Sequence, residues 1–257
     1  MSLQFIMGNS GSGKSYCLYD TVVREAIENP DKNYLVIVPE QFTMQTQKDL
    51  CLAHPKGGIM NIDVLSFGRL AYRVFEEVGQ DARVVLDDEG KNLVLRKIAG
   101  ECEKDLKVFK GNLKKQGYIS EVKSVLSEFA QYGVDFERLD DFMKEVPPES
   151  YLHYKLDDIR TIYEKFEEYL SEKYITKEEM LDVLSDAVPY SDILKGSVVA
   201  MDGFTGFTPV QNRLIGELFS VCEKVMITVT MDGRENPYVY EHPYQILRSA
   251  NRWSHLL

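Results

Sequence analysis

Apolar residues along this chain form two kinds of pattern, short runs and longer stretches with helical spacing. Short runs rich in apolar residues lie at 3–7, 33–38, 60–65, 197–201 and 225–231 and predict strands. The continuous run at 33–38 is typical of a strand that is buried on both faces of a parallel sheet. Helical spacing follows the first four of these runs, at 16–27, 42–52, 66–78 and 209–222, and Ser66 and Thr208 are expected to cap the last two of these helices. The repeated order of strand and helix predicts an α/β fold with a parallel sheet.

The stretch from 87 to 189 shows helical periodicity only. It contains candidate helices at 88–102, 118–131, 136–144, 151–173 and 177–187. Asp87 and Thr176 are expected N-caps, and Glu179 would complete a capping box with Thr176. We therefore predict a discontinuous α/β domain, 1–86 and 196–257, that is interrupted by an all-helical insertion domain at 87–195. A last helix is expected at 244–257, and the chain has the character of a piece of a longer protein.

The first predicted strand and helix are joined by a glycine-rich segment that matches the pattern G-x-x-x-x-G-K-[ST]. Strand, glycine-rich turn and helix form the context of a phosphate-binding loop, or P-loop. Glycines allow successive N–H groups to surround a phosphate, and the helix directs its positive end toward it. In such a loop the lysine reaches the β- and γ-phosphates and the serine binds Mg²⁺. The expected ATP-binding residues are Gly8, Asn9, Ser10, Gly11, Ser12, Gly13, Lys14 and Ser15.

Asp202 follows the apolar run at 197–201 and is the expected second acidic element of a nucleotide site. A P-loop NTPase uses such a residue to hold Mg²⁺, so Ser15 and Asp202 are the expected magnesium residues. The next residue is Gly203, and no carboxylate occurs between Asp202 and Glu217. Glycine cannot accept a proton, so a general base is missing at this position. We predict nucleotide binding with slow or no hydrolysis and assign no catalytic residue.

Aromatic and polar residues follow the ends of three predicted strands. Such ends meet at one edge of a parallel sheet, where ligands bind. Aromatic rings stack on bases, an arginine pairs with phosphates or base edges, and a glutamine both donates and accepts. A core role for the aromatic residues remains the alternative. The candidate nucleic-acid residues are Gln41, Thr43, Phe67, Arg69, Tyr72 and Phe207.

The formal net charge of −11 is unusual for a nucleic-acid-binding protein, but it is unevenly distributed. Residues 135–186 hold 16 acidic and 7 basic side chains, whereas residues 1–115 are balanced. A local basic channel is therefore compatible with the composition. No apolar run is long enough for a membrane span. The four cysteines lie far apart, which favours buried free thiols and a cytoplasmic location.

Together these motifs resemble a superfamily-1 helicase core, and most closely the N-terminal part of the AddB subunit of bacterial AddAB (RexAB-type) helicase–nucleases. The resemblance rests on residues 7–15, 38–43, 64–74 and 202–209 and extends over essentially the whole chain. The segment 202–211 is similar to the helicase box Asp-Glu-Phe-Gln-Asp-Thr-x-Pro-x-Gln without its glutamate. The resemblance thus implies a RecA-like parallel sheet with a degenerate motor site.

Membership of this family would imply a subunit that acts in double-strand break repair by homologous recombination with an AddA-type motor subunit. It would contact single- and double-stranded DNA and scan the single strand for the hotspot sequence Chi, through the six residues named above. Tyr72 stands where the family usually has an indole. The family's C-terminal nuclease domain with its iron–sulfur cluster is not contained in these residues, so no nuclease activity is expected of them.

Two other interpretations stay open. The chain would be an active free-standing P-loop ATPase or a nucleotide kinase, although a kinase needs an arginine-rich lid and the insertion here is acidic. Alternatively, it would be an architectural module whose P-loop no longer functions. Nucleotide titration distinguishes the last interpretation from the other two.

Overall fold

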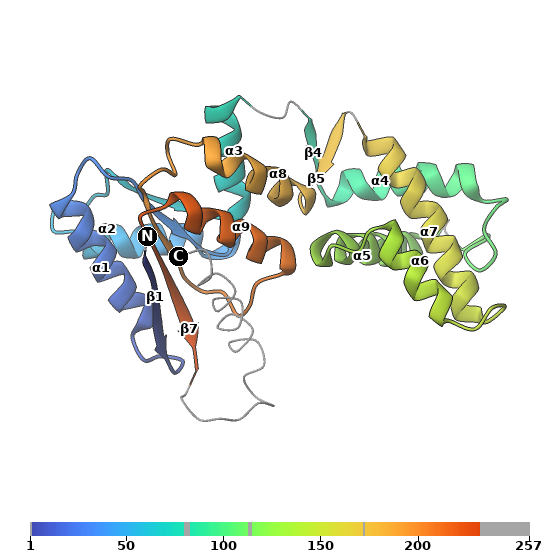
Figure 1. Ribbon diagram of the computed structural model, residues 1–257, viewed down its shortest axis with the longest axis horizontal. Coiled ribbons are helices and arrows are strands. Elements are labelled where there is room, and N and C mark those ends of the chain that lie inside the picture. Colours follow the sequence, from blue (N-terminus) through green and yellow to red (C-terminus); the bar gives the residue numbers. More distant parts are fainter. Residues whose placement is uncertain (1, 80–82, 113–114, 172, 232–257) are drawn as a thin grey trace. The chain divides into compact units, whose positions relative to one another are not determined.

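The computed structural model describes residues 2–79, 83–112, 115–171 and 173–231 (Figure 1). The chain divides into two compact units, one formed by Met1–Gln80 with Leu181–Leu257 and the other by Asp81–Met180. The helix expected at 244–257 lies outside the described residues. The two units are described one after the other.

The first unit is built on a parallel sheet of five strands in the order β1-β7-β6-β2-β3 (Figure 1). The strands are β1 (Ser2–Gly8), β2 (Tyr34–Ile37), β3 (Ile62–Leu65), β6 (Val198–Met201) and β7 (Lys224–Thr230). Every residue of β2 and β6 is buried, as the continuous apolar run predicted for β2. The prediction of an α/β fold with a parallel sheet is confirmed.

Helices cover both faces of this sheet. They are α1 (Lys14–Glu28), η1 (Glu40–Phe42), α2 (Thr43–Ala53), α3 (Phe67–Val78), η2 (Val188–Tyr190) and α9 (Pro209–Val221). Leu18 of α1 and Leu50 of α2 belong to one buried cluster with Val36 of β2. Leu35 and Ile37 alternate with Val36 along the strand and are also fully buried, so the opposite face is covered as well.

Local sequence signals determine where several helices begin. The Ser66 side chain accepts the N–H of Arg69 at the start of α3. Thr208 and Gln211 form a reciprocal capping box at the start of α9, with Pro209 in the first turn. Each arrangement satisfies N–H groups that the helix itself cannot pair. The caps predicted at these positions are confirmed.

The second unit consists mainly of helices. They are α4 (Asp88–Cys102), α5 (Gln116–Tyr132), α6 (Phe136–Glu145) and α7 (Tyr151–Leu170), and α8 (Glu179–Ala187) begins in this unit and continues into the first. The apolar faces of α4, α5, α6 and α7 meet in one core that includes Leu95, Ile119, Ile162 and Phe166. Asp87 caps α4, and the predicted capping box of Thr176 and Glu179 is also formed.

The expectation of an all-helical insertion is wrong. The strands β4 (Val84–Leu86) and β5 (Tyr174–Thr176) pair in parallel in the second unit. Strand β5 lies in the segment where only helices were expected. Each strand has three residues, which is too short for a period-of-two pattern to be recognised in the sequence, and only the pairing with a distant segment defines them.

The cysteines differ in their environments. Cys102 and Cys222 are buried, Cys51 is half-buried and Cys17 is exposed, and all four are free thiols. The expectation of buried thiols is therefore wrong for Cys17, which lies on the solvent face of α1. No helix in the described part of the chain combines the length and apolar character that a membrane span requires.

Candidate nucleotide site and neighbouring surfaces

The glycine-rich segment connects the last residue of β1, Gly8, to the first residue of α1, Lys14. Gly11 and Gly13 have φ angles of 74° and 85°, in the left-handed region that favours glycine. A Cβ atom at Gly8 would collide with the side chain of Ser12. These three glycines therefore have local physical reasons for being glycine, and together they produce a tight turn at the start of the helix.

Gly13 is the N-cap of α1 and provides no side chain that could bond the N–H groups of the first turn. Those N–H groups and the positive end of the helix dipole are thus free to bind an anion. The ammonium group of Lys14 donates a 2.7 Å hydrogen bond to the carbonyl oxygen of Asn9, within the same loop. The Ser15 side chain is exposed. This arrangement places one cation and one hydroxyl beside the uncapped helix end.

Asp202 directly follows β6 and is buried, with 6% of its surface exposed. Its Oδ1 accepts a 2.6 Å hydrogen bond from Thr228 on β7, and its Oδ2 accepts a 2.7 Å bond from Tyr19 on α1. The Tyr19 hydroxyl also lies 3.3 Å from Oγ1 of Thr46 on α2. Burial is the main reason that the pKa of Tyr19 is raised, and the bond to Asp202 raises it further.

Helix α1 begins at the glycine-rich loop and contacts Asp202 through Tyr19. Ser15 and Tyr19 are four residues apart, so both lie on one face of the helix, about one turn of 5.4 Å from each other. Both residues line a hollow on the surface of the first unit, together with Asp20, Asp49 and Leu52. The structure thus brings the glycine-rich loop and Asp202 to the same edge of the sheet.

Gly203, which follows Asp202, has a φ angle of 78°. A Cβ atom there would lie 3.4 Å from Cδ of Pro39 and 3.5 Å from the ring of Phe42. The glycine therefore allows a turn that other residues resist, and it lets the segment after β6 pass close to the segment after β2. The missing carboxylate is accompanied by a backbone conformation that disfavours any side chain.

Phe67, Phe204 and Phe207 form a cluster at the ends of β3 and β6. Ring centroids are 5.3 Å apart for Phe67 and Phe204, 6.4 Å for Phe67 and Phe207, and 5.1 Å for Phe204 and Phe207. Phe67 is buried, with 7% exposed, whereas Phe204 and Phe207 are half-buried. Tilted and edge-on contacts of this kind stabilise the packing of aromatic rings. In this chain Phe67 is a core residue beneath two more accessible rings.

The other candidate nucleic-acid residues differ in accessibility. Thr43 is buried, and its hydroxyl donates to the carbonyl oxygen of Glu40. Gln41 is exposed, and Tyr72 is 56% exposed. Arg69 is exposed and forms an ion pair with Glu40, with 3.2 Å between Nε and Oε1. Gln41, Arg69 and Tyr72 are therefore accessible to a ligand, whereas Thr43 and Phe67 support the structure beneath them.

Sequence reasoning missed the hydroxyl groups that bind Asp202. Tyr19 has the helical spacing of a core residue, and Thr46 lies within a helix without any motif. Thr228 did carry a signal, because it is a single hydroxyl within the otherwise apolar buried segment 225–229. A buried polar side chain requires a partner, and here that partner is Asp202.

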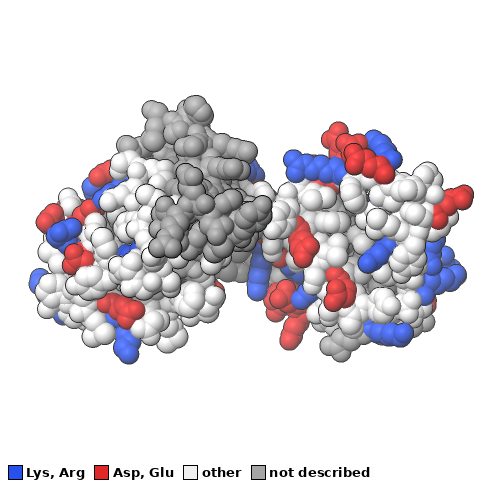
Figure 2. Space-filling view, turned by 90° about the horizontal axis from the view of Figure 1, so that it is seen from below, with Lys and Arg blue, Asp and Glu red and all other residues white. Residues whose placement is uncertain are grey.

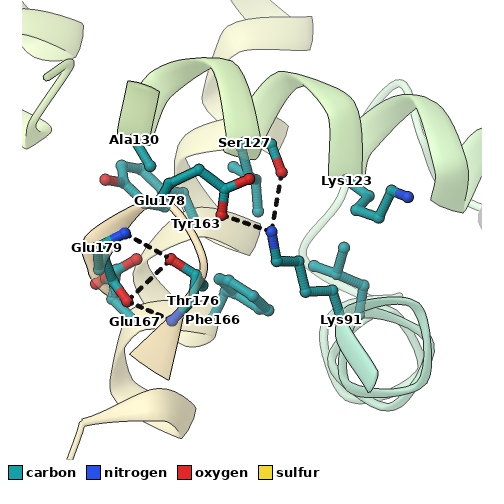
Figure 3. A pocket seen from close by; sticks show the side chains of 12 residues that line it. Lys91, Lys123, Ser127, Ala130, Tyr163, Phe166, Glu167, Thr176, Glu178 and Glu179 are labelled. Carbon is teal, nitrogen blue, oxygen red and sulfur yellow. Dashed lines mark hydrogen bonds and ion pairs between the residues drawn. The ribbon is translucent and has the colours of Figure 1, made fainter. Parts of the chain in front are cut away.

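A second polar cluster lies inside the second unit (Figure 3). The ammonium of Lys91 donates to Glu178 at 2.6 Å and to Ser127 at 3.2 Å. Burial and the neighbouring carboxylate of Glu179 raise the pKa of Glu167 to about 7. These groups come from α4, α5, α7 and the segment around β5, so they connect the elements of this unit to one another.

The charged side chains of the second unit do not form a single basic surface on the face shown in Figure 2, where acidic and basic groups both occur. Lys107 forms an ion pair with Asp157 and lies 4.9 Å above the ring of Tyr154. Lys123 lies 3.6 Å from Asp88. Lysines of this unit are thus partly neutralised by nearby carboxylates.

Comparisons with known proteins identify the family. The family model described as "ADDB, N-terminal" matches residues 5–251. A relative from Lachnoclostridium phytofermentans, named as the B subunit of an ATP-dependent helicase/deoxyribonuclease, is 48% identical over 232 residues, which are 90% of this chain and 20% of that protein. Proteins of the same name from Clostridium kluyveri and Clostridium tetani are 39% and 37% identical, each over 91% of this chain and 20% of their own length. The chain thus spans about a fifth of the length of these relatives. From residue 5 to residue 251, this chain belongs to the AddB N-terminal family.

Proposed function

We propose that this chain is the helicase-like N-terminal part of an AddB subunit, and that it binds ATP with little or no hydrolysis. The observation that carries the proposal is the uncapped start of α1, where Gly11 and Gly13 take left-handed angles and Lys14 lies beside them. Free N–H groups, a helix dipole and an ammonium group are the elements that bind a triphosphate. The parallel sheet and the position of Asp202 support a RecA-like, superfamily-1 fold.

Slow hydrolysis follows from the residues around Asp202. Gly203 offers no general base, and its φ angle of 78° disfavours a side chain that could supply one. A free-standing ATPase or a nucleotide kinase would need such a group or a phosphate acceptor site. Nucleotide is therefore proposed to be held rather than consumed by this part of the subunit.

Calorimetric titration of the 257-residue chain with ATP tests the binding proposal. Wild type should bind, and Lys14→Ala should weaken binding about tenfold or more, because a charge-assisted bond to phosphate contributes roughly 1.5–3 kcal/mol. Lys32→Ala is the matched control, since Lys32 instead pairs with Glu223. Equal affinity of wild type and Lys14→Ala would reject the site. Sustained turnover of several ATP molecules per second would reject the static role.

We further propose that the subunit acts with an AddA-type motor in double-strand break repair, and that Gln41, Arg69, Tyr72 and Phe207 contact the single strand during Chi recognition. The support is their location after the strand ends and the exposure of the first three. The name of the relatives, which describes the B subunit of an ATP-dependent helicase/deoxyribonuclease, is consistent with this role. Phe67 and Thr43 are assigned to support of that surface, because both are buried.

The Chi proposal is tested in the complete two-subunit complex. Arg69→Ala and Tyr72→Ala should reduce the response to the hotspot and leave unwinding by the motor subunit intact. Arg73→Ala is the control on the same helix, because Arg73 pairs at 2.8 Å with Asp63 inside β3, whereas Arg69 pairs with Glu40, which lies beyond the end of β2. A hotspot response that is unchanged in both test variants would reject these contacts.

A further inference from the structure

Asp202 is expected to hold a magnesium ion through water, but the structure shows its carboxylate engaged elsewhere. Thr228 donates to Oδ1 at 2.6 Å and Tyr19 donates to Oδ2 at 2.7 Å. The residue is also buried, since only 6% of it is exposed. Both oxygens thus have a hydroxyl partner from this chain, and the backbone N–H of Asp202 is paired with the carbonyl oxygen of Ile37.

The residues fit a triphosphate and a metal ion to different degrees. The loop N–H groups, the helix end and Lys14 require no metal to attract phosphate. Mg²⁺ demands near-ideal octahedral geometry, and each oxygen of an ionised carboxylate can accept two hydrogen bonds. At Asp202 a hydroxyl occupies one position on each oxygen, and burial restricts the access of a metal-bound water to the other. Asp202 directs one oxygen to β7 and the other to α1. Within the described residues, no three His, Cys, Asp or Glu side chains are grouped so that they could hold a metal ion by themselves.

Tyr19 is the residue through which α1 contacts Asp202. It lies one helical turn after Ser15 on the same face of α1, and it is 9% exposed. Its hydroxyl is held from a second side by Thr46, 3.3 Å away on α2. The Tyr19 ring packs in the core that contains Leu18 and Val22, and this packing keeps its hydroxyl beside Oδ2.

We infer that Tyr19 and Thr228 withdraw Asp202 from metal coordination, so that this site binds a nucleoside triphosphate without dependence on a divalent cation. The inference rests on the proposed ATP site and adds to it the role of two positioning residues. It gives a second reason, besides the missing general base at Gly203, why the site would bind ATP with little or no hydrolysis. The triphosphate is held by the loop alone, while Asp202 joins α1 to β7.

The test is the affinity of the 257-residue chain for a non-hydrolysable ATP analogue, measured by calorimetry in EDTA and in excess Mg²⁺. Wild type should bind with affinities that agree within about twofold. Tyr19→Phe removes only the hydroxyl, and it should make Mg²⁺ strengthen binding about tenfold, since one bond to a charged group is involved. Thr228→Val is a second, isosteric way to free an oxygen. The double variant Tyr19→Phe/Asp202→Asn should no longer bind more tightly in Mg²⁺. Tyr163→Phe is the control for the loss of a buried tyrosine hydroxyl.

Mn²⁺ observed by electron paramagnetic resonance gives an independent readout. With nucleotide present, the Mn²⁺ signal should be the same for wild type and Asp202→Asn, because Asp202 does not contact the metal in wild type, and Tyr19→Phe should change it. Nucleotide binding that requires Lys14 and rises about tenfold with Mg²⁺ in wild type would overturn this inference and leave the nucleotide site standing. A Tyr19→Phe and a Thr228→Val protein that both ignore the metal would also overturn it. Absence of nucleotide binding in wild type would overturn the proposed site itself.

Discussion

The ammonium group of Lys91 donates a 2.6 Å hydrogen bond to Oε2 of Glu178, and the side chain of Lys91 is only 3% exposed. The bond joins α4 to the residue two positions after β5. A buried lysine in this arrangement is held by its partners, because an isolated ammonium group in a protein interior is strongly unfavourable. This ion pair is therefore expected to be decisive for the order of the second unit.

Lys91→Met should destabilise the second unit by about 3–5 kcal/mol, because it leaves the carboxylate of Glu178 buried without its partner. The double variant Lys91→Met/Glu178→Gln should recover part of this loss. Hydrogen exchange of the α4 and α7 amides measures the change within this unit alone. A single variant that is as stable as wild type would show that the pair contributes nothing.

Glu167 makes the stability of the second unit depend on pH. Its folded-state pKa is raised from 4.5 to about 7, mainly by burial and then by Glu179. A raised pKa means that the folded state binds the proton more tightly than the unfolded state, so stability from this group is present below about pH 4.5 and is lost as pH rises to about 7. Glu167→Gln should remove this dependence and protect α7 at pH 8.

The control for that experiment is Glu168→Gln, because Glu168 is the exposed neighbour on the same helix. The measurement is the hydrogen-exchange rate of the α7 amides at pH 5.5 and pH 8, corrected for the pH dependence of exchange in an unfolded chain. The change in protection between the two pH values is compared between the variants. If the protection of α7 in Glu167→Gln fell with rising pH as steeply as in wild type, the Glu167 carboxyl would not be the cause of the pH dependence.

Asp158 holds the backbone of residues 107–109, which follow α4. Its carboxylate accepts backbone N–H groups from Lys107, Val108 and Phe109 at 2.7–2.8 Å, and only 1% of the residue is exposed. Asp158→Ala should cost about 3 kcal/mol or more, since each unpaired buried donor costs roughly 1–3 kcal/mol. Chemical denaturation measures the loss, and Asp157→Ala, next to it and half-exposed, should change stability by less than about 1 kcal/mol. Similar losses of stability in Asp158→Ala and Asp157→Ala would contradict the structural role given to Asp158.

Restoring a carboxylate after Asp202 should not restore hydrolysis. Gly203→Glu places a side chain at a φ angle of 78°, close to Pro39, and should cost about 1–2 kcal/mol from the backbone conformation alone. Thermal melting and steady-state ATP turnover are the measurements. The substitution Gly100→Glu, at a helical glycine where an added Cβ would meet no heavy atom within 4 Å, separates the effect of charge from that of the turn. Rapid turnover by Gly203→Glu would show that the carboxylate was the only missing element.

Much of the first unit could be predicted from local pattern. Continuous apolar runs such as Tyr34–Ile37 identified the central strands, because a strand buried on both faces needs no polar alternation. Ser66 and Thr208 identified helix starts in this unit, and Asp87 identified one in the second unit, because capping involves residues only three positions apart. The glycine pattern at 8–15 identified the turn after β1 for the same local reason.

What the sequence determined by itself was therefore the set of strands in the first unit, most helix starts and the turn between β1 and α1, all of which depend on interactions between near neighbours. Only the tertiary structure decided that β4 pairs with β5, that Phe67 is buried beneath Phe204 and Phe207, and that Tyr19 and Thr228 bind Asp202. Tyr19 and Asp202 are 183 positions apart. Their contact arises when parallel strands bring distant segments to one sheet edge, and no local spacing records it.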